Sequence, residues 1–537
     1  MTPIELYDTT LRDGAQTEGI SYSAQDKLRI VEQLDELGMH YIEGGWPGSN
    51  PKDAQFFRLA KRLRLTTAKL VSFGSTRHPS KTPANDPNLK SLLSTETETI
   101  TIFGKSWDLH VRDVLRRSLD ENLRIIEGSV KFLKQRGRTV IYDAEHFFDG
   151  YRDNPTYALK TLRAAQEAGA DAIVFCDTNG GTIPQELVTI IDAAKRVVRV
   201  PMGIHTHNDS GLAVANALAA IQAGCRQVQG TINGYGERCG NADLVTIIAV
   251  LQLKMGIRCL PEHKLKALTE TSHLVAEISN MVQRPNAPFV GSTAFAHKGG
   301  VHVNAVMKNP RTYEHLDPSL IGNQRKILVS ELSGRSAIVS KAQELALDLS
   351  KETKEAKRLL KLLQQLEHQG YQFEAAEASF ELLLQRHLKH LKPFFELKHF
   401  RIVMETRGHH LISKATIRLR VNGVTEQKSA DGDGPVNALD NAVRKALTEF
   451  YPTLAGMHLT DFKVRVLDEK QGTAAKVRVL IQSQDAHDSW GTIGVSENII
   501  EASWQALVDS LEYKLLKDCK SQRIASSVER TEKRSKR

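Results

Sequence analysis

Strand and helix patterns alternate eight times in the first half of the chain, and this alternation constrains the fold most strongly. Helical periodicity fills the intervals between the strands, and Ser23 and Asp26 have the spacing of a capping box at the start of one helix. Several strands are mostly apolar, as expected where helices cover a parallel sheet. The strands are predicted at residues 4–10, 41–46, 69–74, 97–104, 139–147, 172–178, 202–208 and 227–233.

Potential metal ligands follow three of these strands. Asp13 comes just after the first strand, His205 and His207 lie near the end of the seventh, and Asn241 follows the eighth. Residues i and i+2 of a strand face the same side, so the two histidines point together. Only a closed barrel makes the first and eighth strands neighbours. We therefore expect an α/β fold of the (β/α)₈ (TIM) barrel class over residues 1–258, with a doubly wound open sheet as the alternative.

The chain of 537 residues is too long for one core, so we expect further domains after the barrel. Residues 259–396 predict a mainly helical linker or lid, with helices at 265–282 and 336–366 and a loop rich in Gly and His at 291–302. Residues 397–515 contain a weak repeat of strands, a Gly-containing turn and a helix, which predicts an α+β regulatory or dimerising domain. Residues 516–537 predict a basic, disordered tail.

Composition limits the partners and the compartment. The net charge of +9 arises largely in the last segment, so nucleic-acid binding is a minority interpretation. No apolar run is long enough to span a bilayer, and the first residues lack a secretory signal pattern. Five cysteines without a Cys-x-x-Cys pair indicate reduced thiols. We expect a cytoplasmic protein without a membrane or nucleic-acid partner.

The ligand set indicates metal chemistry. Two imidazoles, a carboxylate and an amide oxygen suit Zn²⁺, Mn²⁺, Co²⁺ or Mg²⁺, and the sequence does not choose among them. The lack of a cysteine ligand disfavours a closed structural zinc site. The loop at 234–241 is rich in glycine, but it follows the last strand and lacks the spacing of a dinucleotide-binding motif.

Other residues at the same barrel end have both functional and structural interpretations. Arg12 is placed to approach a metal-bound oxyanion, or to form a salt bridge with Glu43 or Asp8. Gln16 and Thr178 are candidate substrate-binding residues, although the amide can satisfy backbone groups and the hydroxyl can cap the next helix. Glu145 ends the fifth strand and is a candidate general base, or a residue that orients one.

These segments resemble a known family. Residues 8–16, 205–209 and 234–241 are similar to the signature motifs of the DRE-TIM metallolyases, and within them to the 2-isopropylmalate, homocitrate and citramalate synthases. The similarity extends over the barrel, the linking region and the C-terminal repeat, which resembles the family's allosteric (LeuA-type) dimerisation domain. It therefore covers nearly everything except the basic tail.

The resemblance implies a Claisen condensation of acetyl-CoA with a 2-oxo acid. Asp13, His205 and His207 match metal ligands, and Asn241 matches a looser fourth position. Arg12 would stabilise the developing alkoxide, at about 3–4 kcal/mol for one preorganised charge.

Further roles come from the same resemblance. Glu145 matches a catalytic carboxylate, and His302 and Tyr313 match residues that assist base and hydrolysis chemistry. A homodimer and feedback by isoleucine at the C-terminal domain are also implied.

The acceptor is inferred from three segments that depart from the isopropylmalate pattern, at residues 43–53, 103–111 and 143–150. They resemble the citramalate branch, which uses pyruvate and leads to isoleucine through 2-oxobutanoate. Homocitrate synthases usually carry Glu in place of Asp13, which argues against 2-oxoglutarate. Bulky Trp46, Phe147 and Phe148 are compatible with a small acceptor.

Other function classes are less well supported. The 2-isopropylmalate synthase reaction, with 2-oxoisovalerate as acceptor, is the first alternative. The C-terminal repeat argues against a lyase or carboxytransferase, since such enzymes generally lack it. Metal-dependent hydrolases usually place His-x-His near the first strand, and here the pair lies on the seventh. A non-enzymatic regulator is the remaining class.

Overall fold

The computed structural model describes residues 4–328, 353–373, 376–388, 391–407, 410–467 and 475–535. The chain divides into two compact units, and each is described by itself. One unit runs to Phe295 and includes His315–Arg325. The other contains Ala296–Glu314 and the chain from Lys326 onward.

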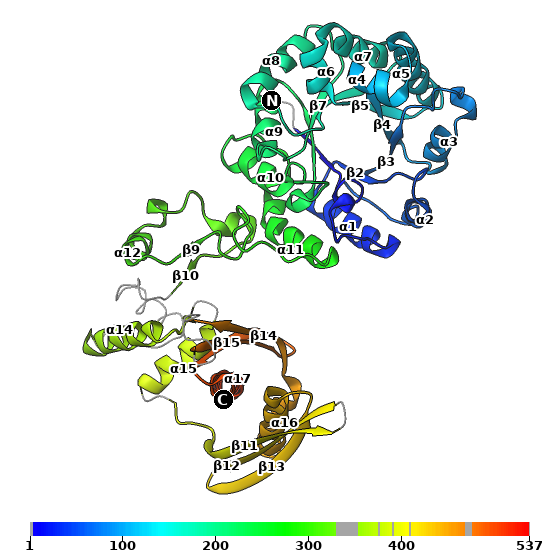
Figure 1. Ribbon diagram of the computed structural model, residues 1–537. Helices are drawn as coiled ribbons and strands as arrows, with labels where there is room; N and C mark the ends of the chain where they lie inside the picture. Colours follow the sequence, from blue (N-terminus) through cyan, green and yellow to red (C-terminus); the bar gives the residue numbers. More distant parts are fainter. Residues whose placement is uncertain are drawn as a thin grey trace. The chain divides into compact units, whose positions relative to one another are not determined.

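The first unit is a closed barrel of eight parallel strands (Figure 1). Strand β1 pairs in parallel with both β2 and β8, and Leu6 lies opposite Val228 in the last pairing. This closure confirms the barrel and excludes the open sheet. The strands are β1 (Glu5–Asp8), β2 (Tyr41–Gly45), β3 (Lys69–Ser75), β4 (Thr99–Lys105), β5 (Thr139–Glu145), β6 (Ala172–Asp177), β7 (Met202–Thr206) and β8 (Gln227–Gly230).

Helices surround the barrel and bury its outer surface. The expected capping box is present, since Ser23 and Asp26 bond each other's backbone N–H groups at the start of α1. A large apolar cluster fills the layer between strands and helices, and a small one that includes Tyr7, Val71 and Val174 lies on the strands. The helices are α1 (Ala24–Leu37), α2 (Pro51–Ala60), α3 (Pro87–Ser94), α4 (Asp108–His110), α5 (Leu119–Lys134), α6 (Phe147–Asp153), α7 (Pro155–Glu167), α8 (Pro184–Ala194), α9 (Ala213–Gln222) and α10 (Leu244–Leu253).

The segment after the barrel departs from one sequence prediction. The single helix expected at 265–282 is a 3₁₀ helix at Glu262–Ala267 followed by α11 (Leu268–Ile278). In the second unit come the short strands β9 (Ala296–His297) and β10 (Lys326–Ile327), with α12 (Gly300–Lys308) between them. The first part of the helix expected at 336–366 lies outside the described residues. Helix α14 covers Thr353–His368, and α15 (Glu377–His387) follows.

The C-terminal repeat is present as two copies, each with three antiparallel strands and a helix (Figure 1). Apolar residues of α16 and α17, among them Leu439 and Leu511, share one buried cluster with residues of the first sheet. The elements are α15 (Glu377–His387), β11 (Glu396–Arg407), β12 (His410–Val421), β13 (Val424–Gly432), α16 (Pro435–Leu447), β14 (His458–Val466), β15 (Val477–Gln484), β16 (Ser489–Ser496) and α17 (Ile499–Ser535).

The C-terminal segment corrects one expectation. Helix α17 continues to Ser535, which differs from the disordered tail expected from residue 516. The charge of the tail suggested disorder, but its Lys, Arg, Glu, Gln and Ala residues are also good helix formers, and they extend an existing helix without a new nucleation step. No helix within the described ranges is long and apolar enough to cross a membrane.

Candidate metal centre

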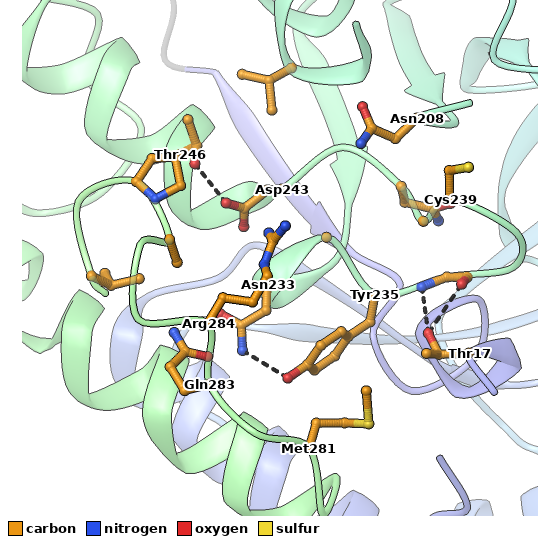
Figure 2. Close-up of a pocket in the computed structure, with 18 of the residues that line it drawn as sticks. Thr17, Asn208, Asn233, Tyr235, Cys239, Asp243, Thr246, Met281, Gln283 and Arg284 are labelled. Atoms are coloured by element: carbon orange, nitrogen blue, oxygen red, sulfur yellow. Dashed lines mark hydrogen bonds between the residues drawn. The ribbon is translucent and has the colours of Figure 1, made fainter. Parts of the chain in front are cut away.

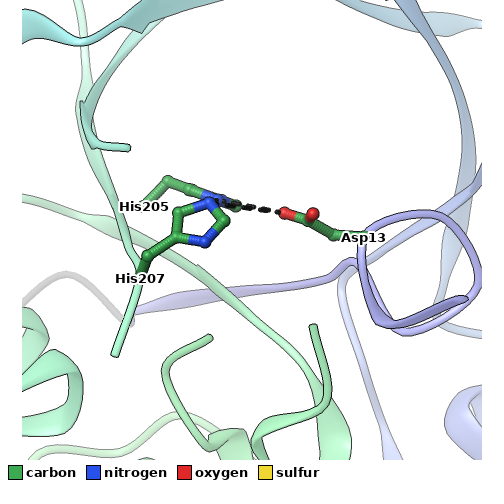
Figure 3. Close-up of side chains that lie close together, drawn as sticks. All are labelled: Asp13, His205 and His207. Carbon is green, nitrogen blue, oxygen red and sulfur yellow. Dashed lines mark hydrogen bonds and ion pairs between the residues drawn. The ribbon is translucent and has the colours of Figure 1, made fainter. Parts of the chain in front are cut away.

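Three buried side chains meet where the barrel strands end (Figure 3). Asp13 lies in a tight turn after β1, in which the backbone N–H groups of Arg12, Asp13 and Gly14 all donate to the Thr9 carbonyl. His205 is in β7 and His207 follows that strand. The side chains are nearly inaccessible, with Asp13, His205 and His207 2%, 5% and 6% exposed. The sequence prediction that these residues come together is confirmed.

Their spacing fits a shared divalent cation. The Nε2 atom of His205 lies 3.2 Å from Asp13 Oδ2 and 3.2 Å from His207 Nε2, and His207 Nε2 lies 3.9 Å from Asp13 Oδ2. Two ligands about 2.1 Å from one ion, at 90° to the tetrahedral angle, are separated by about 3.0–3.4 Å. Both 3.2 Å separations fall in this range, and the 3.9 Å between His207 Nε2 and Asp13 Oδ2 exceeds it by about 0.5 Å. Three ligand atoms facing one another in a buried site repel unless a cation or proton lies among them. The donor set therefore fits the metal that the sequence indicates.

Asn241 lies beside this cluster. Its Nδ2 atom donates to Asp13 Oδ2 at 2.8 Å, while its buried Oδ1 has no hydrogen-bond partner among the described residues. The backbone of Asn241 forms a bridge with that of His207, which fixes the loop after β8 against the end of β7. In this orientation the amide nitrogen faces Asp13, so the role of Asn241 as a fourth ligand stays a prediction that requires rotation of the amide.

Charges around the site set the ionisation of these groups. Burial opposes ionisation of Asp13, but the charge of Arg12 and the hydrogen bond from His205 hold the pKa of Asp13 well below its usual range. Burial also opposes protonation of His205, yet the bond to Asp13 raises its pKa above the ordinary value. Burial, and then the neighbouring His205, lower the pKa of His207 to about 3.

Arg12 contacts both Asp13 and Glu43. Its Nε donates to Glu43 at 2.5 Å, its Nη1 lies 3.3 Å from Asp13, and its guanidinium carbon is 3.8 Å from the centre of the Phe73 ring. Glu43 also accepts from the hydroxyl of Tyr7 at 2.6 Å. The salt bridge considered from the sequence is therefore present, and it fixes the guanidinium next to the ligand cluster.

The other barrel residues predicted from the sequence lie at the same end but differ in their contacts. Glu145 forms an ion pair with Lys105, and the two side chains are 22% and 18% exposed. The Thr178 hydroxyl accepts from the backbone N–H of His146 at 2.9 Å, so it holds the loop after β5; the helix cap considered for it is absent, since α8 begins after Ile183 without a side-chain cap. Gln16 is exposed and lines a cavity of about 250 Å³ together with Arg12. Their functional roles stay predictions.

His302 and Tyr313 belong to the second unit. Both side chains are exposed, and their rings pack together with centroids 4.2 Å apart. Their assistance to catalysis, and the lid function of this segment, stay predictions.

The bulky residues proposed near the acceptor separate into two environments. Trp46 lies beside the aromatic rings of Phe73 and Phe103, at 6.1 and 5.6 Å between centroids. Phe147 and Phe148 are fully buried in the main apolar cluster. They lie in the first turn of α6, so they pack under that helix and support the barrel wall.

Sequence reasoning missed Gln229, which contacts His205 directly, and Asp143, which contacts it through Gln229. Gln229 Oε1 lies 3.0 Å from His205 Nδ1, and Gln229 Nε2 donates to Asp143 at 3.2 Å. Burial raises the pKa of Asp143 to about 7. The sequence signal that could have identified them is the presence of a polar residue, Gln229 or Asp143, within a strand that is otherwise buried.

A cavity of about 540 Å³ opens beside Asn241 (Figure 2). The loop after β8 forms one wall, with Tyr235, Arg238 and Cys239, and Met281 and Arg284 come from the segment after α11. Thr17 holds this loop in place, since its hydroxyl donates to the Gly236 carbonyl and accepts from the Gly236 backbone N–H. Asn241 also lines the cavity, so the cavity reaches the loop after β8 that carries this residue.

Comparisons with known proteins cover nearly the whole chain. Residues 3–275 match the HMGL-like family, residues 289–370 the homocitrate synthase post-HMGL domain-like family, and residues 374–515 the LeuA allosteric (dimerisation) domain.

Named relatives align along almost their full length. The chain is 54% identical to the (R)-citramalate synthase of Aquifex aeolicus, over 96% of this chain and 98% of the relative, and 54% identical to that of Geobacter sulfurreducens over the same shares. It is 30% identical to the 2-isopropylmalate synthase of Methanocaldococcus jannaschii, over 96% of this chain and 95% of the relative. The chain therefore belongs to the HMGL-like family and, within it, to the (R)-citramalate synthases.

Proposed function

We propose that the chain catalyses the condensation of acetyl-CoA with pyruvate and water to give (R)-citramalate and CoA. The observation that carries this proposal is the 46–54% identity, over at least 95% of the chain, to relatives named (R)-citramalate synthase. The relative named 2-isopropylmalate synthase is more distant, at 30%. The buried cluster of Asp13, His205 and His207 supports the metal dependence of the reaction.

In this proposal Asp13, His205 and His207 hold a divalent ion, with Asn241 beside them. A bound metal supplies a Lewis acid that polarises the ketone of the acceptor. Arg12 is held by Glu43 and keeps further N–H donors for the carboxylate of pyruvate and for the oxygen that becomes the alkoxide.

Glu145 is the proposed general base. It takes a proton from the methyl carbon of acetyl-CoA, and the carbanion attacks the keto carbon of pyruvate, forming the new carbon–carbon bond. Hydrolysis then breaks the thioester, leaving the second carboxylate on the product and the thiol on CoA. His302 and Tyr313 assist the hydrolysis, and Gln16 and Thr178 contact the substrates.

The cavity beside Asn241 is the proposed site for part of acetyl-CoA. Its volume of about 540 Å³ and its lining of apolar residues with Arg238 and Arg284 suit a molecule with an apolar arm and phosphate groups. Asn241 lines it and also bonds Asp13, so an acetyl group entering there would approach the acceptor.

The test is CoA release by purified protein with pyruvate, 2-oxoisovalerate and 2-oxoglutarate, with and without EDTA. We expect the highest kcat/KM with pyruvate, and loss of activity in EDTA that Zn²⁺, Mn²⁺, Co²⁺ or Mg²⁺ restores. A clear preference for 2-oxoisovalerate would transfer the assignment to 2-isopropylmalate synthase. Full activity after metal removal would contradict the metal dependence.

The second part of the proposal concerns assembly and regulation. The match of residues 374–515 to an allosteric dimerisation domain supports a homodimer and an amino-acid effector, for which isoleucine is our candidate. Light scattering should give twice the monomer mass, and calorimetry should detect isoleucine. A monomer at micromolar concentration would contradict the first claim, and absence of heat with isoleucine, alongside binding of leucine, would contradict the second.

A further inference from the structure

A buried amide connects one metal ligand to a carboxylate on the far side of the barrel interior. Gln229 on β8 lies between His205 on β7 and Asp143 on β5. Its Oε1 atom is 3.0 Å from His205 Nδ1, and its Nε2 atom donates to Asp143 Oδ1 at 3.2 Å. Gln229 is fully buried, and Asp143 and His205 are 3% and 5% exposed. Both contacts are therefore shielded from water.

The direction of these hydrogen bonds follows from the groups themselves. The Nε2 atom of Gln229 donates to Asp143 Oδ1, so the NH₂ end of the amide faces Asp143. The amide oxygen then faces His205, and an oxygen there requires that Nδ1 carry a proton. A neutral imidazole with a proton on Nδ1 has its lone pair on Nε2. That Nε2 atom is the one directed at Asp13 and His207.

The second histidine lacks such a partner. The Nδ1 atom of His207 is buried, and no hydrogen bond to it occurs among the described residues. Either nitrogen of His207 can carry its proton without loss of a protein contact. Control of the tautomer by a side chain is thus limited to His205.

We propose that Gln229 and Asp143 are positioning residues that fix His205 in its metal-binding tautomer and orientation. This inference rests on the proposed metal centre and adds to it the residues that prepare one ligand. Partners of this kind typically change metal affinity by about 10–100-fold when they are removed. If Asp143 is lost, the Gln229 amide is free to rotate and offer its NH₂ group to His205, which favours the wrong tautomer.

The test measures Co²⁺ binding by the full-length protein with a competing chelator, together with the visible absorption of the bound ion. Gln229→Leu should weaken Co²⁺ binding about 10–100-fold and change the absorption spectrum. Asp143→Leu should weaken it less. Gln229→Glu should lose less affinity than Gln229→Leu, because a carboxylate oxygen still accepts from Nδ1 of His205, although it no longer donates to Asp143.

Gln227→Leu is the matched control. Gln227 lies on the same strand and face as Gln229 but at the start of the strand, and it is 3% exposed. Its amide nitrogen is 3.5 Å from the Glu5 carboxylate. It should bind Co²⁺ like wild type, and thermal melting of each metal-free variant checks folding. If Gln229→Leu fails to fold, Asp143→Leu and Gln229→Glu still test the inference.

The outcomes separate this inference from the proposed function. The positioning role alone is overturned if wild-type protein binds Co²⁺ and both Gln229→Leu and Asp143→Leu bind it with the same affinity and the same absorption spectrum. An equal loss in Gln227→Leu also overturns it, because the effect would then be one of barrel stability. Wild-type protein that binds no Co²⁺ overturns the metal centre and this inference together.

Discussion

Replacing Arg12 by lysine should abolish most of the activity while leaving the metal centre in place. The guanidinium makes three interactions at once, with Glu43 at 2.5 Å, Asp13 at 3.3 Å and the ring of Phe73 at 3.8 Å. A lysine keeps the charge but has one nitrogen, so it cannot bind Glu43 and a developing oxyanion with the same fixed geometry. Loss of one preorganised donor costs about 3–4 kcal/mol, or roughly 10²–10³ in kcat.

The assay is CoA release at saturating pyruvate and metal. Arg136→Lys is the control, because Arg136 also stacks on a phenylalanine, Phe132, at 3.4 Å, but follows α5 and has no contact with the ligands. This control should retain kcat within about twofold. A loss smaller than about tenfold in Arg12→Lys would refute the argument that Arg12 stabilises the transition state.

Three further predictions concern stability, metal uptake and the ligand loop. Lys27→Met should destabilise the protein by about 3–5 kcal/mol in urea unfolding, since it leaves Asp53 buried without the cation now 2.5 Å away; an unchanged midpoint would contradict this. Metal affinity should rise about tenfold per pH unit below the raised pKa of His205 and level off above it, because the imidazole must lose its proton to bind; calorimetry that shows no pH dependence would refute it. Gly240→Ala should lower kcat/KM at least about tenfold, since a Cβ there would lie 2.1 Å from the Gly234 carbonyl oxygen. Gly137→Ala is the control: Gly137 has a similar positive φ but open space around it, so the change should cost only about 1–2 kcal/mol of stability.

The barrel could be predicted because its periodicity is local. Each strand and helix is recognisable from a few neighbouring residues, and closure follows from ligands after the first and eighth strands. The convergence of Asp13 with His205 and His207 was predictable for the same reason, since parallel strands end at one face of the barrel. The capping box of Ser23 and Asp26 is also a purely local pattern.

Other features depend on contacts that no local pattern contains. The bond between Asp143 and Gln229 crosses the barrel interior from β5 to β8, so it requires the register of the closed sheet. Phe147 and Phe148 pack into the core because a helix begins at Phe147, directly after the strand, and this reversal redirects their side chains. The helical continuation after residue 516 was missed because net charge outweighed helix propensity in the sequence argument.

The central claim is that Asp13, His205 and His207 hold one divalent ion that receives pyruvate. Anomalous diffraction from crystals grown with Co²⁺ and pyruvate tests it directly. The account predicts one strong anomalous peak about 2.0–2.3 Å from Asp13 Oδ2 and from the Nε2 atoms of both histidines, with pyruvate oxygens in the remaining positions. A peak elsewhere, or pyruvate bound away from these three side chains, would contradict it.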